Sequence, residues 1–446
     1  PSTILTMRYY DIWSLALALA LGACSQYEEM PSGKDYAATV ITQQEQEIIS
    51  LLRSSEYGWS LILIPDEGNH GGINLSMKFI SDKEATIASE EYGETVEVPK
   101  DPKNPGAGTE QIYQTEFTSN YHFSHNSGLR LTFDTYNKPL NYYSTPDWGI
   151  PNGYNGDYEF IVEKVSPDKD VIYLTGCRTG NKMQMIRLKG DTKAYLEGTK
   201  VIKEAVTGKA LAPLKLGGKT VALSIFGLAR QLWVRYDDKS ELLPFYYTDK
   251  GIKLIKPLTL GGETLEGLTL DKDKATMTPL HGGSKLALQV GKYDLTKKHL
   301  YLYFYEGYAS NVALDAFKTA NEIQRTDTYK GLYEEYIDLG LSPGISRPSM
   351  SLTLEKGIEG LSKGFRPVYY MDFTSIYGEP NQFHTIRIIQ YGSTYFYARR
   401  AQEFLLEYLV YYSPYTVTDA TDAHGYHWLT SPKDNDEFWC KVESFV

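Results

Sequence analysis

Short runs of alternating apolar and polar residues, each closed by turn-forming residues, recur along most of this 446-residue chain. The run INLSMKFIS is followed by Asp82-Lys83 and a second run, EATIAS, and Asn126-Ser127-Gly128 separates another such pair. Alternation of period two with Gly, Asn and Asp between the runs is typical of antiparallel strands joined by tight turns. The pattern therefore predicts a mainly β protein built from antiparallel meanders.

The first predicted domain covers residues 41–190. Thr42 and Glu45 form a capping-box pattern before apolar residues of helical period, which predicts a helix over 42–55. About eight strands fit between 57 and 190, enough for a small closed barrel. By analogy with such barrels we expect this antiparallel meander to be calycin-like.

Two further units are expected because the chain is longer than a single hydrophobic core normally serves. Residues 191–208 have the pattern of a helical connector, which opens a second β-rich unit over 191–297. The remainder, 298–446, mixes strand patterns with two helical ones, NVALDAFKTANEI and AQEFLLEYLVYY. The expected fold class is thus mainly β with an α+β C-terminal part.

An apolar run from Ile12 to Leu21 lies near the start of the chain, after Met7-Arg8. At about ten residues it is too short for a membrane-spanning helix, which needs about twenty. A basic residue followed by such a run is typical of a secretion signal. We expect Met7 to be the initiator and therefore leave residues 1–6 out of the fold prediction.

The run ends in Leu21-Gly22-Ala23-Cys24, which resembles a lipobox. We therefore expect 7–24 to be a lipoprotein signal peptide, Cys24 to carry the lipid, and 25–40 to be a tether. The acidic residues of SQYEE after Cys24 resemble the surface-export signal of Bacteroidota lipoproteins. The predicted location is the outer membrane, lipid-anchored at the cell surface; the alternative is an ordinary signal peptide with a cysteine there by chance.

The balance of acidic and basic residues indicates which classes of partner to expect. With 45 basic and 56 acidic residues the net charge is −11, and no basic run is present. Nucleic-acid binding depends on neutralising phosphates, so nucleic acid is not an expected partner. The 37 tyrosines fit the half-buried face of a sheet, and exposed tyrosine also suits contact with sugars or peptides.

Motifs of catalysis and metal binding are absent from the sequence: there is no GxSxG, no HExxH and no P-loop. His122 and His125 lie three apart on a strand pattern and so point to opposite faces, and His424 and His427 lack an evident third ligand. We therefore nominate no catalytic residues, metal ligands or cofactor. Pairing of the two remaining cysteines is left open, because sequence cannot place them within bridging distance.

The strongest binding candidate is the loop 141–158, which is long and rich in Pro and Gly. It carries the aromatic residues Tyr142, Tyr143, Trp148 and Tyr154. Such rings stack on the faces of sugars or peptides, so they are predicted to contact a glycan or peptide ligand. The alternative is that the same rings cover the end of the barrel.

Several stretches carry a resemblance that is specific over residues 57–255. They are Gly58-Trp59, GGINLSMKF (71–79), LTFDTYN (131–137), NYYSTPD (141–147), TGCRTGNKMQMIRL (175–188) and FYYTDKGIKL (245–254). In these the chain resembles uncharacterised Bacteroidota outer-membrane lipoproteins, a domain of unknown function often encoded beside SusC/SusD-type uptake proteins. The resemblance implies a surface or periplasm-facing lipoprotein and possible partnership with such an uptake complex, and it implies no catalytic residues.

The function expected from these features is accessory binding of a glycan or peptide for nutrient uptake at the outer membrane. The lipobox, the tether, the β-rich body and the aromatic loop all favour it. One alternative is an adhesin or structural surface lipoprotein. Another is a hydrolase with dispersed carboxylates, since a glycosidase pair can lie far apart in sequence.

Overall fold

The computed structural model describes residues 33–445, with gaps. The residues left out within that range are 66–69, 102, 105, 107, 126–127, 147–152, 327–332, 342–348, 355–367, 388–398 and 434–436. The chain divides into two compact units, residues 1–51 and 52–446. Within the described ranges, no helix combines the length and the apolar character needed to cross a bilayer.

Helix α2 (Gly33–Arg53) precedes the first strand. It ends near the predicted position but begins nine residues before the expected start at residue 42, so the segment from Gly33 to residue 40, which was predicted as part of the tether, is helical. The intervening KDYAATVI contains no Gly or Pro to interrupt a helix. Thr42 consequently lies inside the helix, and the capping box predicted there is wrong.

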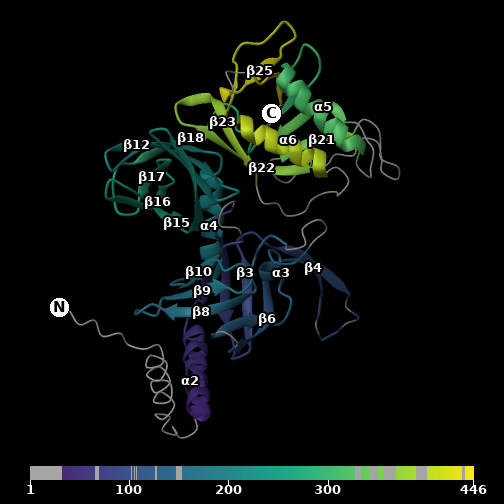
Figure 1. Ribbon diagram of the computed structural model, residues 1–446. Helices are drawn as coiled ribbons and strands as arrows, with labels where there is room; N and C mark the ends of the chain where they lie inside the picture. The colour runs from purple at the N-terminus through teal and green to yellow at the C-terminus, as the bar shows by residue number, and fades with distance from the viewer. Residues whose placement is uncertain are drawn as a thin grey trace, which may run out of the picture. The chain divides into compact units, whose positions relative to one another are not determined.

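The first barrel is a closed sheet of eight antiparallel strands (Figure 1). The strands are β1 (Trp59–Leu63), β2 (Ile73–Phe79), β3 (Glu84–Ser89), β6 (Glu116–Ser124), β7 (Arg130–Phe133), β8 (Glu159–Val165), β9 (Val171–Gly176) and β10 (Lys182–Arg187). Their order is β1-β10-β9-β8-β7-β6-β3-β2. Leu61 pairs with Leu75 on one side and Met185 on the other, and all three are fully buried.

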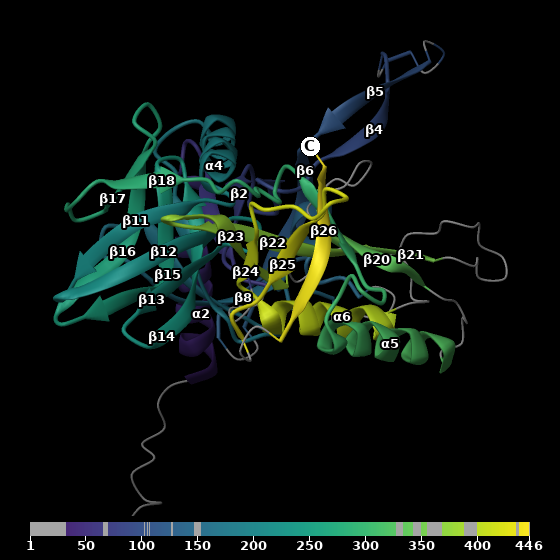
Figure 2. The same cartoon turned by 90° about the horizontal axis from the view of Figure 1, so that it is seen from above.

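Three small features complete this region. The hairpin of β4 (Glu94–Pro99) and β5 (Thr109–Gln114) forms its own two-stranded sheet and reaches away from the barrel strands (Figure 2). A short helix, α3 (Lys138–Asn141), follows β7. The indole Nε1 of the buried Trp59 donates to the carbonyl of Leu52 at 2.8 Å, which fixes the end of α2 to the first strand.

The second barrel follows helix α4 (Thr192–Val206), which begins after the N-cap Asp191 as the predicted connector required. Its strands close in chain order from β11 to β18. They are β11 (Ala210–Leu216), β12 (Lys219–Phe226), β13 (Gln231–Tyr236), β14 (Lys239–Thr248), β15 (Gly251–Leu260), β16 (Glu263–Asp271), β17 (Thr276–Pro279) and β18 (Leu286–Gln289). Asp249-Lys250 forms a tight turn between β14 and β15.

The third barrel also closes in chain order, from β19 to β26, and two helices accompany it. Its strands are β19 (His299–Tyr303), β20 (Tyr333–Gly340), β21 (Ser349–Leu354), β22 (Val368–Ile376), β23 (Glu379–Arg387), β24 (Tyr415–Val417), β25 (His427–Thr430) and β26 (Trp439–Phe445). The helices are α5 (Asn311–Thr326) and α6 (Arg399–Tyr412), which lie side by side (Figures 1 and 2).

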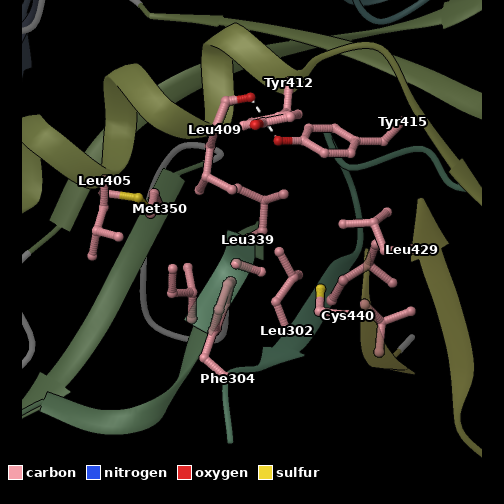
Figure 3. Close-up of a cluster of buried hydrophobic side chains, with 14 of the residues drawn as sticks. Leu302, Phe304, Leu339, Met350, Leu405, Leu409, Tyr412, Tyr415, Leu429 and Cys440 are labelled. Atoms are coloured by element: carbon pink, nitrogen blue, oxygen red, sulfur yellow. Dashed lines mark hydrogen bonds between the residues drawn. The ribbon is translucent and has the colours of Figure 1, made fainter. Parts of the chain in front are cut away.

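The helices and strands of the third barrel share one core. Leu405 and Leu409 of α6 pack with Leu339 and Met350 of the sheet (Figure 3). The hydroxyl of the buried Tyr415 donates to the carbonyl of Leu409 at 2.7 Å, which satisfies a carbonyl in the last turn of the helix. The predicted fold class, mainly β with helices in the C-terminal part, is confirmed.

Candidate functional site

The aromatic loop predicted as a binding platform is largely packed inward. Tyr143 is 1% exposed and Tyr154 is 6% exposed, so neither offers a free ring face. Tyr142 is half-buried, with its ring centroid 5.1 Å from that of Tyr143 and 5.5 Å from that of Tyr92. Trp148 lies outside the described residues, so ligand binding by this loop stays a prediction.

The structure also shows the surroundings of several of the cysteine and histidine candidates. Cys24 lies outside the described residues. Cys177 and Cys440 are both free, and burial raises the pKa of the Cys440 thiol, so it is not poised to react. His122 contacts the carboxylate of Asp134 at 2.8 Å. In the described part of the chain no three His, Cys, Asp or Glu side chains gather as a metal site would require.

A cleft of about 850 Å³ lies between the first and second barrels. Its first wall is built from β1, β8, β9 and β10, and its second wall from β14, β15 and β16. We call it the inter-barrel cleft. Its volume is within the range of about 300–1,000 Å³ typical of small-molecule sites.

Both walls of the cleft contain an irregularity in strand pairing. On β8, Val162 pairs with Leu174 and Lys164 pairs with Tyr173, so Glu163 is an extra residue that opposes no partner on β9. On β15, the segment 254–257 stands opposite the single residue Glu266 of β16, because the pairing resumes only at Leu258. Glu163, the segment 254–257 and Glu266 all line the cleft. Bulges re-aim side chains next to functional sites, and both of these bulges place side chains at the cleft.

Regular pairing supplies the rest of the first wall. Lys164 pairs with Tyr173, Tyr173 with Gln184, and Gln184 with Ile62, so these side chains form one row across four strands. Their neighbours Ile172 and Leu174 point into the barrel and are 1% exposed. The row therefore stands on the outer face and lines the cleft.

The second wall is built in the same way. Tyr246 of β14 pairs with Lys253 of β15, and both line the cleft. Phe245 and Tyr247, on either side of Tyr246, belong to the core of the second barrel, so Tyr246 faces outward. Burial raises the pKa of Tyr246 to about 12, which keeps its hydroxyl neutral at ordinary pH.

Polar contacts already occupy the carboxylates of the cleft. Glu163 accepts from the hydroxyl of Thr175 at 2.5 Å and from the ammonium of Lys182 at 3.1 Å. The bonds from Thr175 and Lys182 lower the pKa of Glu163, so it remains ionised. Glu266 lies 3.1 Å from Nε2 of His281. A glycosidase acid needs a raised pKa, and Glu163 has the opposite shift.

Glycines allow the two barrels to approach closely beside this cleft. The amide of Gly71 donates to the carbonyl of Ala229 at 2.9 Å, and that of Gly72 donates to the carbonyl of Phe245 at 3.0 Å. A Cβ on Gly71 would lie 2.0 Å from the carbonyl oxygen of Phe245. Asn74 extends the contact, since its side-chain amide donates to the carbonyl of Tyr247 at 2.9 Å. The amides of Gly71 and Gly72 in the GGIN segment are therefore used to join the backbones of the two barrels.

A buried ion pair lies in the same junction. Nη2 of Arg230 contacts Oε1 of Glu90 at 3.0 Å and also contacts Glu91. Lys203 of α4 contacts the Glu91 carboxylate at 2.6 Å. Burial alone lowers the pKa of Arg230, but the carboxylates of Glu91 and Glu90 raise it above its usual value, so the guanidinium stays charged. Burial, with the charge of Arg230, lowers the pKa of His70 to about 3.

The turn that carries Arg230 also reaches the third barrel. The amides of Leu228 and Ala229 donate to Oδ2 of Asp372 at 2.7 and 2.8 Å. Asp372 belongs to β22 and is fully buried, and burial raises the pKa of its carboxyl to about 7. The β12–β13 turn thus holds the first barrel through Arg230 and the third through Asp372.

The sequence patterns did not nominate the lysines and tyrosines of the cleft. Lys164, Tyr173 and Lys253 each occupy the outward position of an ordinary alternating strand, where charged or half-buried aromatic residues are expected. The only local signal is KLIKPL, residues 253–258, which breaks strict alternation and places a proline within a strand. Proline in a strand is found at edges and bulges, so this departure marked the irregularity.

Comparison with known proteins places the chain in a family. A family model described as "Domain of unknown function (DUF4302)" matches residues 34–272. That segment contains both walls of the inter-barrel cleft. No curated protein matches the chain.

Among solved structures, one described as "The Structure of Intact Ap-TbpB (N and C lobes)" aligns at 8% identity over 84% of this chain. The alignment spans 66% of that chain with a TM-score of 0.12, which is too low to carry an argument about fold or function. The family model covers more than half of the chain, which confirms the expected membership of an uncharacterised domain family. The protein therefore belongs to the DUF4302 family, a domain of unknown function.

Proposed function

We propose that the protein is a lipid-anchored binding protein of the cell envelope that captures a small ligand in the inter-barrel cleft. The observation that carries the proposal is the cleft itself, about 850 Å³ in volume and lined by two tyrosines, several apolar side chains and charged groups. A concave, mainly preformed space with a few polar groups is the usual form of a small-molecule site. The bulges at Glu163 and at 254–257 line the cleft.

The lipid anchor and the location belong to the same proposal. The lipobox-like Leu21-Gly22-Ala23-Cys24 supports attachment to the outer membrane, with the body at the cell surface. There the protein would serve nutrient uptake as an accessory to a SusC/SusD-type complex. The resemblance to Bacteroidota lipoproteins encoded beside such complexes supports this assignment.

Binding accounts for the cleft better than hydrolysis does. The two carboxylates that line the cleft are Glu163 and Glu266, and each already contacts a basic side chain. Hydrolysis of a glycosidic bond needs one carboxyl group that is protonated at working pH. The bonds from Thr175 and Lys182 lower the pKa of Glu163, which counts against that role for it.

The test is a ligand array with a variant that fills the cleft. Purified full-length protein in detergent would be applied to glycan and peptide arrays, and positive spots would be repeated with Gln184→Trp. Gln184 lies in the outward row of the first wall, so the indole would occupy the cleft. Lys78→Trp is the matched control, because Lys78 is exposed on β2 of the same barrel and outside the cleft.

We expect binding that Gln184→Trp abolishes and Lys78→Trp preserves. Melting curves of both variants would show that each is folded. Binding that survives Gln184→Trp would place the ligand elsewhere. A folded wild-type protein that binds no glycan or peptide would contradict the proposed function.

A further inference from the structure

The inter-barrel cleft has a charge opposite to that of the whole chain. The chain carries a net charge of −11. The cleft is lined by four lysines, Lys164, Lys182, Lys253 and Lys256, and by two glutamates. Lining groups of one sign raise the local concentration of ligands of the other sign. The excess of lysine therefore favours a negatively charged ligand.

The glutamates cancel only part of this excess, because the pair formed by Glu163 and Lys182 leaves the other lysines of the cleft uncompensated by Glu163. Glu163 is held by Lys182 and Thr175, and Glu266 is held by His281. Lys164 places its ammonium 4.8 Å from the ring centroid of Tyr173, an interaction that leaves the positive charge unneutralised. Over the residues that the structure describes, neither Lys164 nor Lys253 pairs with a carboxylate.

The lysines stand on both walls. Lys164 and Lys182 belong to β8 and β10 of the first barrel, whereas Lys253 and Lys256 belong to β15 of the second. A ligand with a single charge can satisfy only one wall at a time. Positive groups on both walls fit a ligand that carries negative groups at intervals along its length.

Flat and apolar surface lies among these charges. Tyr173, Ile255 and Pro257 line the cleft and are at least partly exposed, and Tyr173 belongs to the same outward row as Lys164. Aromatic and aliphatic side chains pack against the C–H faces of sugar rings, while ammonium groups bind carboxylate or sulfate oxygens. Repeated rings with repeated negative groups satisfy both requirements.

We infer that the inter-barrel cleft binds an acidic oligosaccharide through Lys164 and Lys253. The inference rests on the proposed function and names its ligand class. Both flanking sheets are closed barrels, and their pairing is interrupted only briefly in the two walls, at Glu163 and at 254–257, so an extended peptide finds no long strand edge to which it could add by main-chain hydrogen bonds. That geometry favours the oligosaccharide over an acidic peptide.

The experiment is titration calorimetry on the full-length protein in detergent. Four probes would be compared: a galacturonate tetrasaccharide, a sulfated galactan tetrasaccharide, a neutral galactan tetrasaccharide and tetraglutamate. The first two separate carboxylate from sulfate as the source of the charge. We expect binding of at least one acidic saccharide that weakens as NaCl is raised, because salt screens partly exposed charges.

Two substitutions test the named lysines. Lys253→Ala and Lys164→Ala should each weaken binding of the acidic saccharide by about tenfold, the size expected when one hydrogen bond to a charged group is lost. Lys219→Ala is the matched control, since Lys219 is on the second barrel, outside the cleft, and pairs with Asp237. That variant should bind as the wild type does.

The outcomes separate the inference from the function on which it rests. The inference would be overturned if the neutral saccharide or tetraglutamate bound as tightly as the acidic saccharides. If Gln184→Trp abolished that binding, the cleft would still be a binding site. Acidic-saccharide binding unchanged by both lysine variants would also overturn it. The inference would be overturned as well if the folded protein bound none of the four probes but bound another ligand in the cleft.

Discussion

Nη2 of Arg230 lies 3.0 Å from Oε1 of Glu90, and both side chains are buried, at 1% and 3% exposure. The two residues are 140 positions apart in the chain and join the second barrel to the first. Removing one partner of a buried pair leaves an uncompensated charge away from solvent. We expect Arg230→Met to lower the free energy of unfolding by about 3–5 kcal/mol, measured by urea denaturation.

An exposed ion pair gives the control for that substitution. Lys219 and Asp237 also form a pair, with side chains 38% and 57% exposed. Solvent screens such pairs, so Lys219→Met should change the free energy of unfolding by at most about 1 kcal/mol. Equal effects of the two substitutions would show that burial of Arg230 is not what makes its pair important.

The close approach at Gly71 predicts a second effect on stability. A methyl group there would lie 2.0 Å from the carbonyl oxygen of Phe245 and 2.5 Å from that of Arg230, and backbone atoms cannot move aside as a side chain can. We expect Gly71→Ala to cost about 1–3 kcal/mol or more, measured by thermal melting. Gly190→Ala is the control, because a Cβ at Gly190 has nothing within 4 Å. A melting temperature of Gly71→Ala equal to that of the control would refute the close approach.

Asp372 predicts a dependence of stability on pH. Its pKa is about 7 in the folded protein, because of burial, and close to 3.9 in an unfolded chain. The folded state therefore holds the proton more tightly, and this carboxyl group reduces stability as the pH rises from about 4 to about 7. The slope expected from one such group is about 1.4 kcal/mol per pH unit.

The measurement for Asp372 is urea denaturation of wild type and Asp372→Asn across that pH range. Asparagine does not titrate, so the unfolding free energy of the wild type should fall relative to that of Asp372→Asn as the pH rises towards 7. His70 titrates in the opposite sense, since burial lowers its pKa to about 3, but it is present in both proteins and cancels in the difference. A difference that stays constant across the range would contradict the prediction.

Tyr143 tests the role of the aromatic loop. Its side chain is 1% exposed, so truncation should leave a cavity. We expect Tyr143→Ala to lower the free energy of unfolding by about 3–5 kcal/mol. Tyr113→Ala should change it by about 0.5 kcal/mol or less, because Tyr113 is 69% exposed on the β4–β5 hairpin. Thermal melting of the two variants distinguishes these outcomes. If Tyr143→Ala were as stable as the wild type, Tyr143 would again be a candidate for ligand contact.

Cys24 tests the anchor. If it carries lipid, Cys24→Ala should move the protein from the membrane fraction to the soluble fraction of lysed cells, because each buried CH₂ of an acyl chain contributes about 0.8 kcal/mol. Cys177→Ala should leave the protein in the membrane fraction, since Cys177 lies at the end of the first barrel beyond β9. Equal partition of the two variants would rule out attachment at Cys24.

Local sequence determined most of the elements of this protein. Alternation along INLSMKF specifies a strand with an apolar side, the mainly apolar run WSLIL specifies a buried strand, and Asp191 before an amphipathic run specifies α4. These patterns depend on neighbours two to four residues away, so they can be read from the chain. The start of α2 could not be read from the sequence, because Thr42 fits a helix cap as well as it fits a helix interior.

Tertiary structure alone decided the candidate site. Lys164 and Lys253 are ordinary outward residues of two strands, and nothing near either one in sequence shows that they line one cleft. Their meeting depends on barrel closure, on two bulges, and on contacts such as Arg230 with Glu90. The physical reason is that a strand pattern specifies which face of a sheet is buried, whereas the partner of the outer face is set by packing between distant parts of the chain.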